Sequence, residues 1–201
     1  MDPNEIEISV GHPHRKEIIN EFKKFSDIKK VLEIGSSWGP NLLLLNKYFP
    51  KISYTGIDIS KQKIDAGNEF FKVNNIDNII LKHIDFTALD AFEDSEFDII
   101  LTDAVLIYVD PKYIKNLANE ITRIASKGLI LIEFDNDNND PMGSVYDTNW
   151  VRDYGSLLSP YSDKIEKRCF TENIWPGKWS FHGKIITVFL NRKEIYNERI
   201  I

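Results

Sequence analysis

Cysteine is nearly absent, since Cys169 is the only one in 201 residues. A single cysteine excludes an internal disulfide framework and a cysteine-built zinc site. Long apolar runs are also absent: none approaches the roughly 20 residues of a membrane helix, and the start of the chain is polar. Positive charge is not in excess, because the formal net charge is -6 and the pI is about 5.3. We therefore expect a cytoplasmic protein with no membrane and no nucleic-acid partner.

The composition that remains is that of one globular domain. The chain is 42% hydrophobic and 28% charged, and its length is enough to bury a core. It has no repeat and no long linker; the polar run 135–141 is better interpreted as an extended loop. We expect a single domain over residues 1–201, with a helical lead-in over 1–28 and a substrate-side cap over 135–180.

The hydrophobic pattern alternates between strand and helix along most of the chain. Buried runs predict strands over 30–35, 52–58, 78–83, 97–104 and 129–134, and amphipathic spacing predicts helices over 14–25, 39–48, 61–73 and 111–125. A Gly128 stop signal separates the last of these helices from the strand that follows.

The last third breaks this alternation. It predicts a helix over 149–158 and two strands, 164–170 and 182–191, that form an antiparallel hairpin at the sheet edge. The fold class is therefore α/β: a doubly wound, mostly parallel, seven-stranded sheet with an antiparallel C-terminal hairpin and helices on both faces.

One stretch, residues 31–43, reads as a buried strand, a glycine turn and a helix start in immediate succession. Gly35 ends the apolar run, and Gly39 with Pro40 marks the first turn of the helix. Such a turn presents backbone N–H groups that suit the negative end of a ligand. Glu33 is an acid inside the apolar strand, which is costly unless something such as a ligand cation or hydroxyl satisfies it.

Acids also stand at the ends of the next strands along the chain. Asp58 ends the second, Asp85 with Phe86 follows the third, and Asp103 ends the fourth. In a parallel sheet these ends meet at one crevice. Asp58 follows Gly39 at about the 20-residue distance expected for an acid that binds ribose hydroxyls, with helix capping as the simpler alternative.

The segment Glu33-Ile34-Gly35-Ser36-Ser37-Trp38-Gly39 resembles the first motif of the class I, Rossmann-like S-adenosylmethionine-dependent methyltransferases. The resemblance covers about residues 30–134, and Ser37 stands where a middle glycine is common. It implies that the turn carries the methionine part of the cofactor, that Asp58 binds the ribose and that Asp85 meets the adenine. The cofactor-binding residues expected on this basis are Glu33, Gly35, Ser36, Ser37, Gly39, Asp58, Ile59, Asp85, Phe86 and Asp103.

The segment 103–111 is more loosely similar to small methylases associated with bacterial surface-sugar pathways, such as pseudaminic acid synthesis. In many relatives a histidine stands at the position of Tyr108. Tyr108 and Asp103 are therefore the catalytic candidates, with a half-buried structural tyrosine as the alternative. A tyrosine hydroxyl near the transferred methyl would position a substrate hydroxyl.

Four residues are candidate substrate contacts: Tyr108, Tyr146, Trp150 and His12. The aromatic residues of the last third serve equally well as core. His12 and His14 precede the first helix, where some methyltransferases fold an N-terminal segment over the cofactor. Solvent-facing positions are the simpler interpretation for these two histidines.

A metal site is not expected. Some related O-methyltransferases hold Mg²⁺ with an acid after strand four and an Asp-Asn pair after strand five, which would be Asp103, Asp135 and Asn136 here. That pair, however, opens a polar run typical of a solvated loop.

We thus expect methyl transfer from S-adenosylmethionine to a small polar acceptor, at an oxygen, with a sugar-pathway metabolite as one option. Alternatives are a nucleic-acid or protein methyltransferase, a nicotinamide-dependent oxidoreductase and a non-catalytic cofactor-binding subunit. The oxidoreductase is disfavoured because the third glycine of its motif is missing. The sequence leaves a homodimer open.

Overall fold

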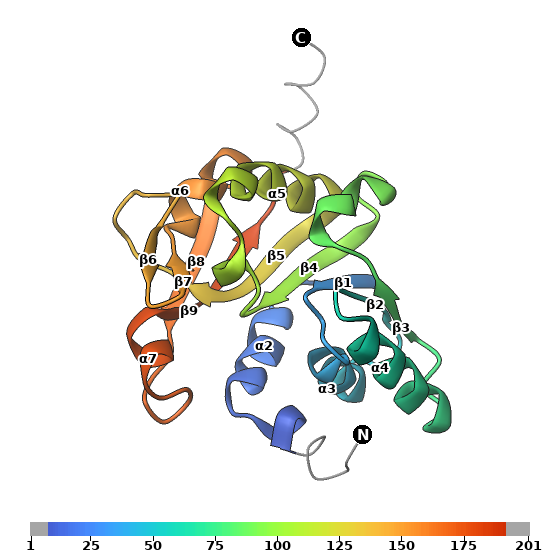
Figure 1. Ribbon diagram of the computed structural model, residues 1–201. Coiled ribbons are helices and arrows are strands. Elements are labelled where there is room, and N and C mark those ends of the chain that lie inside the picture. The colour runs from blue at the N-terminus through green and yellow to red at the C-terminus, as the bar shows by residue number, and fades with distance from the viewer. Residues whose placement is uncertain (1–7, 192–201) are drawn as a thin grey trace.

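A computed structural model describes residues 8–191, in which seven strands form one mixed sheet (Figure 1). The outermost parts of the expected domain, residues 1–7 and 192–201, lie outside this range. Within residues 8–191, no helix is long and apolar enough to span a membrane.

The first two thirds alternate strands and helices, as predicted. The elements are α2 (His14–Phe22), β1 (Lys30–Ile34), α3 (Pro40–Tyr48), β2 (Ser53–Asp58), α4 (Lys61–Val73), β3 (Ile79–His83), η1 (Phe86–Ala91), β4 (Phe97–Asp103), η2 (Leu106–Tyr108), α5 (Pro111–Ile124) and β5 (Ala125–Phe134). The sheet order is β3-β2-β1-β4-β5-β9-β8, and its first five strands are parallel. The order reverses at β1, so the carboxyl ends of β1 and β4 flank the crevice of a doubly wound sheet.

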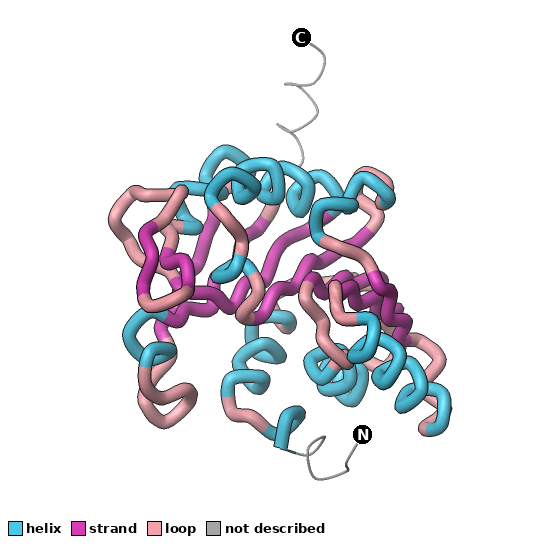
Figure 2. The backbone as a smooth tube through the Cα atoms, in the orientation of Figure 1, coloured by secondary structure: helices cyan, strands magenta, loops and turns pink. Residues whose placement is uncertain are grey.

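The sheet lies between two layers of helices (Figure 2). Helices α2, α3 and α4 cover one face, and α5 covers the other. Side chains alternate between the two cores along each strand: Val31 packs with the α2 and α3 side, and Leu32 with the α5 side. Glu33 shares the face of Val31 and therefore points toward α3.

The last third adds an edge to the sheet and a small cap. It contains β6 (Ser144–Tyr146), β7 (Asn149–Val151), α6 (Tyr154–Leu158), η3 (Ser159–Tyr161), β8 (Lys164–Cys169), α7 (Lys178–His182) and β9 (Gly183–Phe189). β9 runs antiparallel to both β5 and β8, which confirms the predicted hairpin. The hairpin lies at the edge of the sheet, with β9 on its inner side.

The prediction of one helix over residues 149–158 is wrong in its first half. Asn149–Val151 instead pairs with Ser144–Tyr146 as a two-stranded sheet. Asp153 then caps the helix, because its side chain accepts from the Ser156 N–H, and α6 begins only at Tyr154.

Two other helix ends and one strand start also differ from the sequence prediction. α2 ends at Phe22 rather than at residue 25, and α5 gives way directly to β5 at Ala125. Gly128 lies inside β5 instead of stopping a helix: a Cβ there would lie 2.4 Å from the carbonyl oxygen of Val188. His182, expected to begin the last strand, is the last residue of α7.

Candidate active site

The turn between β1 and α3 requires left-handed backbone at three positions. Gly35, Ser37 and Gly39 have φ values of 73°, 52° and 87°. Ser37 adopts the conformation that a middle glycine would adopt more easily. The N–H groups of Gly35 and Ser36 both donate to the carbonyl oxygen of Ile57, which fixes the turn against the end of β2.

Asp58 ends β2 and holds the same turn from the other side. Its Oδ2 accepts from the Ser37 N–H and its Oδ1 from the Ser60 N–H, each at 2.8 Å. Ser60 occupies the N-cap position of α4, but its own side chain makes no capping hydrogen bond. A carboxylate oxygen can accept more than one hydrogen bond, so Asp58 remains able to bind hydroxyl groups.

A cavity of about 300 Å³ opens at the carboxyl ends of the strands. Six predicted site residues line it: Gly35, Asp58, Ile59, Asp85, Phe86 and Tyr108. The other walls are apolar and come from Ile34, Ile57, Ile84, Val105 and Val109. Tyr108 is 69% exposed and therefore stands at the mouth. The structure thus brings the ends of four strands to one crevice, as the sequence predicted.

Glu33 and Asp103 lie beside the glycine turn and are linked by Asn41. The Asn41 amide donates to Glu33 Oε1 at 2.7 Å and to Asp103 Oδ2 at 2.9 Å. Within residues 8–191, three buried oxygens here have no hydrogen-bond partner: Glu33 Oε2, Asp103 Oδ1 and Ser36 Oγ. Buried acceptors without a donor are costly, so this corner is shaped for a ligand that donates hydrogen bonds.

The surroundings shift the pKa values of the two carboxyl groups in opposite directions. Burial raises the pKa of Glu33 to about 8. Burial also acts to raise the pKa of Asp103, but the hydrogen bond and charge of His14 and the charge of Arg15 hold it below its ordinary value. Asp103 is therefore the ionised acid of the pair at neutral pH, and Glu33 holds a proton that a cationic ligand would displace.

The N-terminal segment folds onto Asp103. His14 Nε2 lies 2.9 Å and Arg15 Nη1 3.0 Å from Asp103 Oδ2, and the same Arg15 nitrogen lies 2.7 Å from Asn41 Oδ1. His14 is only 3% exposed, so the solvent-facing interpretation of this residue is wrong. His14 can be buried because its imidazole is hydrogen-bonded to the Asp103 carboxylate. The spacing of residues in the sequence does not reveal that partner.

Two tryptophan rings, Trp175 and Trp179, pack beside His12 and His14. The Trp175 ring is stacked on the His14 ring with centroids 4.0 Å apart, and His12 lies 5.1 Å from Trp175. Trp175 is stacked in turn on Trp179 at 4.0 Å. The chain before α7 and the segment before α2 therefore meet at the Asp103 side of the site.

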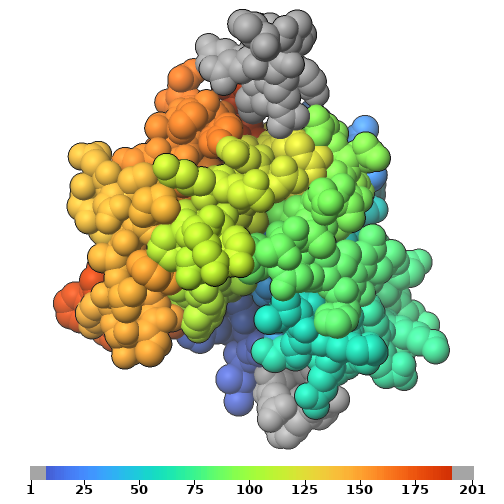
Figure 3. Space-filling model, turned by 45° about the horizontal axis from the view of Figure 1, so that its top comes forward, coloured from blue at the N-terminus to red at the C-terminus, as the bar shows by residue number. Residues whose placement is uncertain are grey.

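The loop that carries Tyr108 is held from two sides. Glu133 of β5, fully buried, accepts from the N–H groups of Val105 and Ile107, and burial raises its pKa to about 7. Arg152, also fully buried, donates to the carbonyl oxygens of Leu106 and Val109. Figure 3 shows the corresponding surface, where the segment around residue 150 lies beside the segment around residue 108.

Three predicted substrate contacts, Tyr146, Trp150 and His12, lie outside the cavity lining. The Tyr146 ring packs on His182 with centroids 4.3 Å apart. The Trp150 ring lies 5.3 Å from the Arg152 guanidinium carbon. Tyr146 and Trp150 belong to the small β6–β7 sheet that supports the Tyr108 loop, and the role of all three residues as substrate contacts stays a prediction.

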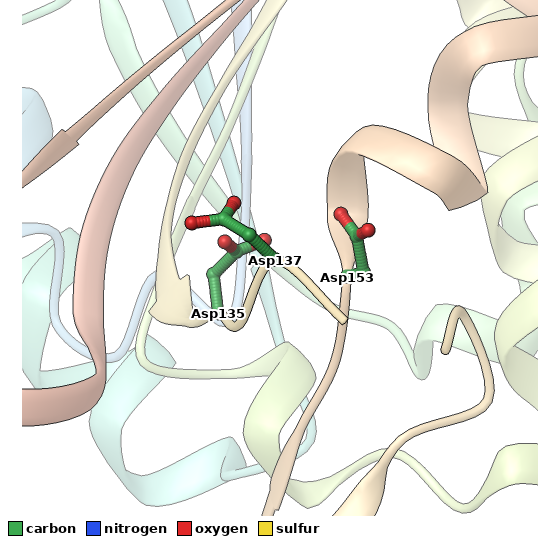
Figure 4. Close-up of side chains that lie close together, drawn as sticks. All are labelled: Asp135, Asp137 and Asp153. Carbon is green, nitrogen blue, oxygen red and sulfur yellow. The ribbon is translucent and has the colours of Figure 1, made fainter. Parts of the chain in front are cut away.

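Three carboxylates after β5, from Asp135, Asp137 and Asp153, lie close enough to share a cation (Figure 4). Lys167 Nζ already lies 2.7 to 3.1 Å from an oxygen of each. Lys184 Nζ lies within 2.9 Å of Asp135 and Asp137. Two ammonium groups therefore offset two of the three carboxylate charges, and the cluster joins the cap to the sheet. Asp103, the other acid weighed as a metal ligand, is bonded to His14, Arg15 and Asn41 instead.

Comparison with known proteins supports the class of this domain. Residues 31–128, about half of the chain, match the family model of the methyltransferase domain. A ribosomal RNA small subunit methyltransferase G from Mesoplasma florum is 31% identical over 105 residues, which cover 52% of this chain and 43% of that protein. The chain matches less than half the length of each of its curated relatives.

Solved structures extend the likeness in fold to most of the chain. The [4+2]-cyclase SpnF has a TM-score of 0.68 at 13% identity, covering 88% of this chain and 81% of that one. The N-terminal domain of EvdMO1, solved with SAH bound, has a TM-score of 0.59 at 16% identity, covering 88% and 80%. The α/β fold prediction is confirmed by these structures, and the family match over residues 31–128 is to a methyltransferase domain.

Several site residues were not found from the sequence. Arg15, Glu133 and Arg152 carry no local signal, because their partners lie far away in the chain. Asn41 had one weak signal: it is the only polar side chain in the run Pro40–Leu45.

Proposed function

We propose that this chain transfers the methyl group of S-adenosylmethionine to a small polar acceptor, at an oxygen atom. The observation that carries the proposal is the pair of buried acids, Glu33 and Asp103, beside the glycine turn, each with one oxygen that has no hydrogen-bond partner in the described part of the chain. A mostly apolar cavity with acids at its rim lies on the other side of that turn. A ligand with a cationic amino-acid end and a flat nucleoside end matches both features.

The nucleoside end fits the cavity. Asp58 would accept hydrogen bonds from vicinal ribose hydroxyls, as the resemblance implies. Asp85 Oδ1 already accepts from the N–H and hydroxyl of Thr87, which fixes the carboxylate at the rim and leaves its second oxygen for an amino group. Phe86 and the isoleucine walls would cover the faces of the base.

The methionine end fits the acid pair. An ammonium group would donate to Glu33 Oε2 and Asp103 Oδ1, the two oxygens of this acid pair that lack a hydrogen-bond partner within residues 8–191. Gly35 keeps the turn compact, because an added Cβ would lie 2.5 Å from Val105 Cγ2. The buried acid in the first strand, unfavourable in isolation, thereby acquires a charge partner.

When bound, the cofactor supplies a sulfonium-activated methyl group. The chain's own residues hold the reacting atoms in line, and alignment alone can contribute several kcal/mol to catalysis. Glu133 and Arg152 fix the loop of Tyr108 at the mouth, where the tyrosine hydroxyl would orient the acceptor.

A small acceptor is favoured by the charge of the chain. The net charge of -6 disfavours a large polyanion such as RNA. We take a hydroxylated metabolite of a surface-sugar pathway as the first candidate. An RNA acceptor is the second candidate, because one relative is named as a ribosomal RNA methyltransferase.

Transfer of a radiolabelled methyl group from S-adenosylmethionine tests the proposal. The protein is incubated separately with a set of nucleotide sugars and sugar phosphates, with small-subunit ribosomal RNA and with denatured protein. Label is expected in an ether-linked methyl group of the first set. Label only in RNA or protein would contradict the acceptor assignment, and no label anywhere would contradict the transferase.

A further inference from the structure

The Asn41 side chain joins the two buried acids of the site. Its amide nitrogen lies 2.7 Å from Glu33 Oε1 and 2.9 Å from Asp103 Oδ2. An amide nitrogen has two hydrogens, so each acid receives one of them. The amide oxygen accepts from Arg15 Nη1 at 2.7 Å. Asn41 is only 3% exposed, so these hydrogen bonds form away from water.

The three partners fix a single orientation of the Asn41 amide. Arg15 has only donors and can therefore meet only the amide oxygen. The carboxyl oxygens of Glu33 and Asp103 accept, and they need the amide nitrogen. A flipped amide would lose all three hydrogen bonds. Asn41 is the second residue of α3, directly after Pro40 and the glycine turn, so its backbone is held by the same turn.

The hydrogen bonds to Asn41 use one oxygen of each acid and leave the other open. Glu33 Oε2 and Asp103 Oδ1 are buried and have no hydrogen-bond partner in the part of the chain that the structure describes. Burial raises the pKa of Glu33, and the charge of Asp103 raises it further. That second effect is expected for two carboxyl groups that lie close together. The two open oxygens thus belong to neighbouring groups that one amide holds.

We propose that Asn41 is a positioning residue that orients Glu33 and Asp103 to form one binding site for a primary ammonium group. The site would thereby select a ligand with a free α-amino group. This inference rests on the proposed function, in which the two acids receive the methionine end of the cofactor. An ammonium group can donate to both open oxygens at once. A nucleoside thioether without an amino group leaves both unsatisfied, which is costly in a buried site.

A neutral amide suits this position because it adds no charge. A lysine there would itself supply the positive charge that the acids lack and would compete with the ammonium group of the ligand. Asn41 instead holds both carboxyl groups and leaves their charge for the ligand. Arg15 and His14 contact Asp103 through Oδ2, the oxygen that Asn41 also uses, so Oδ1 stays open.

Calorimetric titration of the wild type with two ligands tests the ammonium site. The ligands are SAH and deamino-SAH, in which a hydrogen atom replaces the α-amino group. SAH is expected to bind about 30-fold more tightly, the usual effect of hydrogen bonds between charged groups. Equal affinities for the two ligands would overturn this proposal alone, whereas no binding of SAH to the wild type would overturn the proposed function itself.

Asn41→Leu tests the positioning role, because leucine has the same branched shape but no amide. The affinity for SAH should fall about 30-fold, and the affinity for deamino-SAH should stay within about threefold of the wild-type value. An equal loss for both ligands would show that Asn41 only supports the fold of the turn, and this would overturn the proposal. Unchanged SAH binding would overturn it as well.

Asn46→Leu is the matched control. Asn46 lies on the same helix, and its amide oxygen accepts from Asn78, not from either acid. This variant should bind both ligands as the wild type does. Urea denaturation shows whether each variant is folded. If Asn41→Leu is not, Asn41→Ala takes its place in the same comparison, and the preference of the wild type for SAH over deamino-SAH decides the proposal if neither variant folds.

Discussion

Glu33, Gly35 and Gly39 reach the site from seven consecutive residues, whereas the groups around Asp103 come from opposite ends of the chain. The first group depends on backbone conformation, with positive φ values at the turn. The second depends on side-chain contacts between His14, Asp103 and Trp175. The glycine turn is therefore encoded by a short local stretch of sequence, whereas the contacts around Asp103 form only when the fold is complete.

The largest loss of stability is expected from Gly35→Ala, which alters the glycine turn between β1 and α3. A Cβ at residue 35 would lie 2.5 Å from Val105 Cγ2, and φ is 73°. Strain and overcrowding together should lower the free energy of unfolding by about 3 kcal/mol. Urea denaturation measures this loss.

Gly177→Ala is the matched control for this substitution. Gly177 has φ of 71° but no atom within 4 Å of an added Cβ. It should lose only the part due to backbone strain, about 1 kcal/mol. Equal losses in the two variants would show that contact with Val105 is unimportant.

Arg152→Met tests whether the distant contacts stabilise the site as strongly as the local turn. The substitution leaves the carbonyl oxygens of Met142, Leu106 and Val109 without their donor. We expect a loss of about 2 kcal/mol, from the penalty for buried unpaired acceptors. Arg168→Met, on the exposed edge strand beside Glu17 and Glu21, should cost less than 1 kcal/mol. If Arg152→Met lost less unfolding free energy than Arg168→Met, the stabilising role of the buried Arg152 hydrogen bonds would be contradicted.

Glu33→Gln tests the raised pKa of Glu33 through the pH dependence of stability. Native Glu33 keeps its proton up to about pH 8, whereas a glutamate in the unfolded chain loses it near pH 4.5. Between these values the native state binds more protons, so stability falls with rising pH by at most about 1.4 kcal/mol per pH unit for this one group.

Glutamine has no such proton to lose. Relative to wild type, Glu33→Gln should therefore gain stability steadily from pH 5.5 to 7.5, as measured by urea unfolding at each pH. Glu69→Gln, at an exposed glutamate of α4, serves as the control. Parallel stability curves for wild type and Glu33→Gln would contradict the raised pKa.

The sequence predicted the doubly wound α/β fold class, the hairpin and six of the eleven residues that line the cavity, because these follow from local patterns. Periodic apolar runs define the strands, and the loops after parallel strands must meet at one edge. The small β6–β7 sheet was missed because its three-residue strands are too short for periodicity and all three residues of β6 are exposed.

The partners of Asp103 could not be predicted for a different reason. A histidine in a lead-in segment looks the same in sequence whether it faces solvent or a carboxylate 89 residues away. Arg152 likewise gives no local sign that it will be fully buried against three carbonyl groups. Such contacts depend on tertiary packing, which single-residue patterns do not encode.

Calorimetric titration with SAH tests the cofactor site most directly. We expect one saturable site per chain in the wild type. Asp58→Ala should weaken binding about 10- to 100-fold, because a carboxylate that accepts ribose hydrogen bonds is lost. Asp65→Ala, which removes an exposed acid paired with Lys61, should bind as the wild type does. Absence of binding to the wild type at millimolar SAH, or equal affinities in Asp58→Ala and wild type, would contradict the assignment.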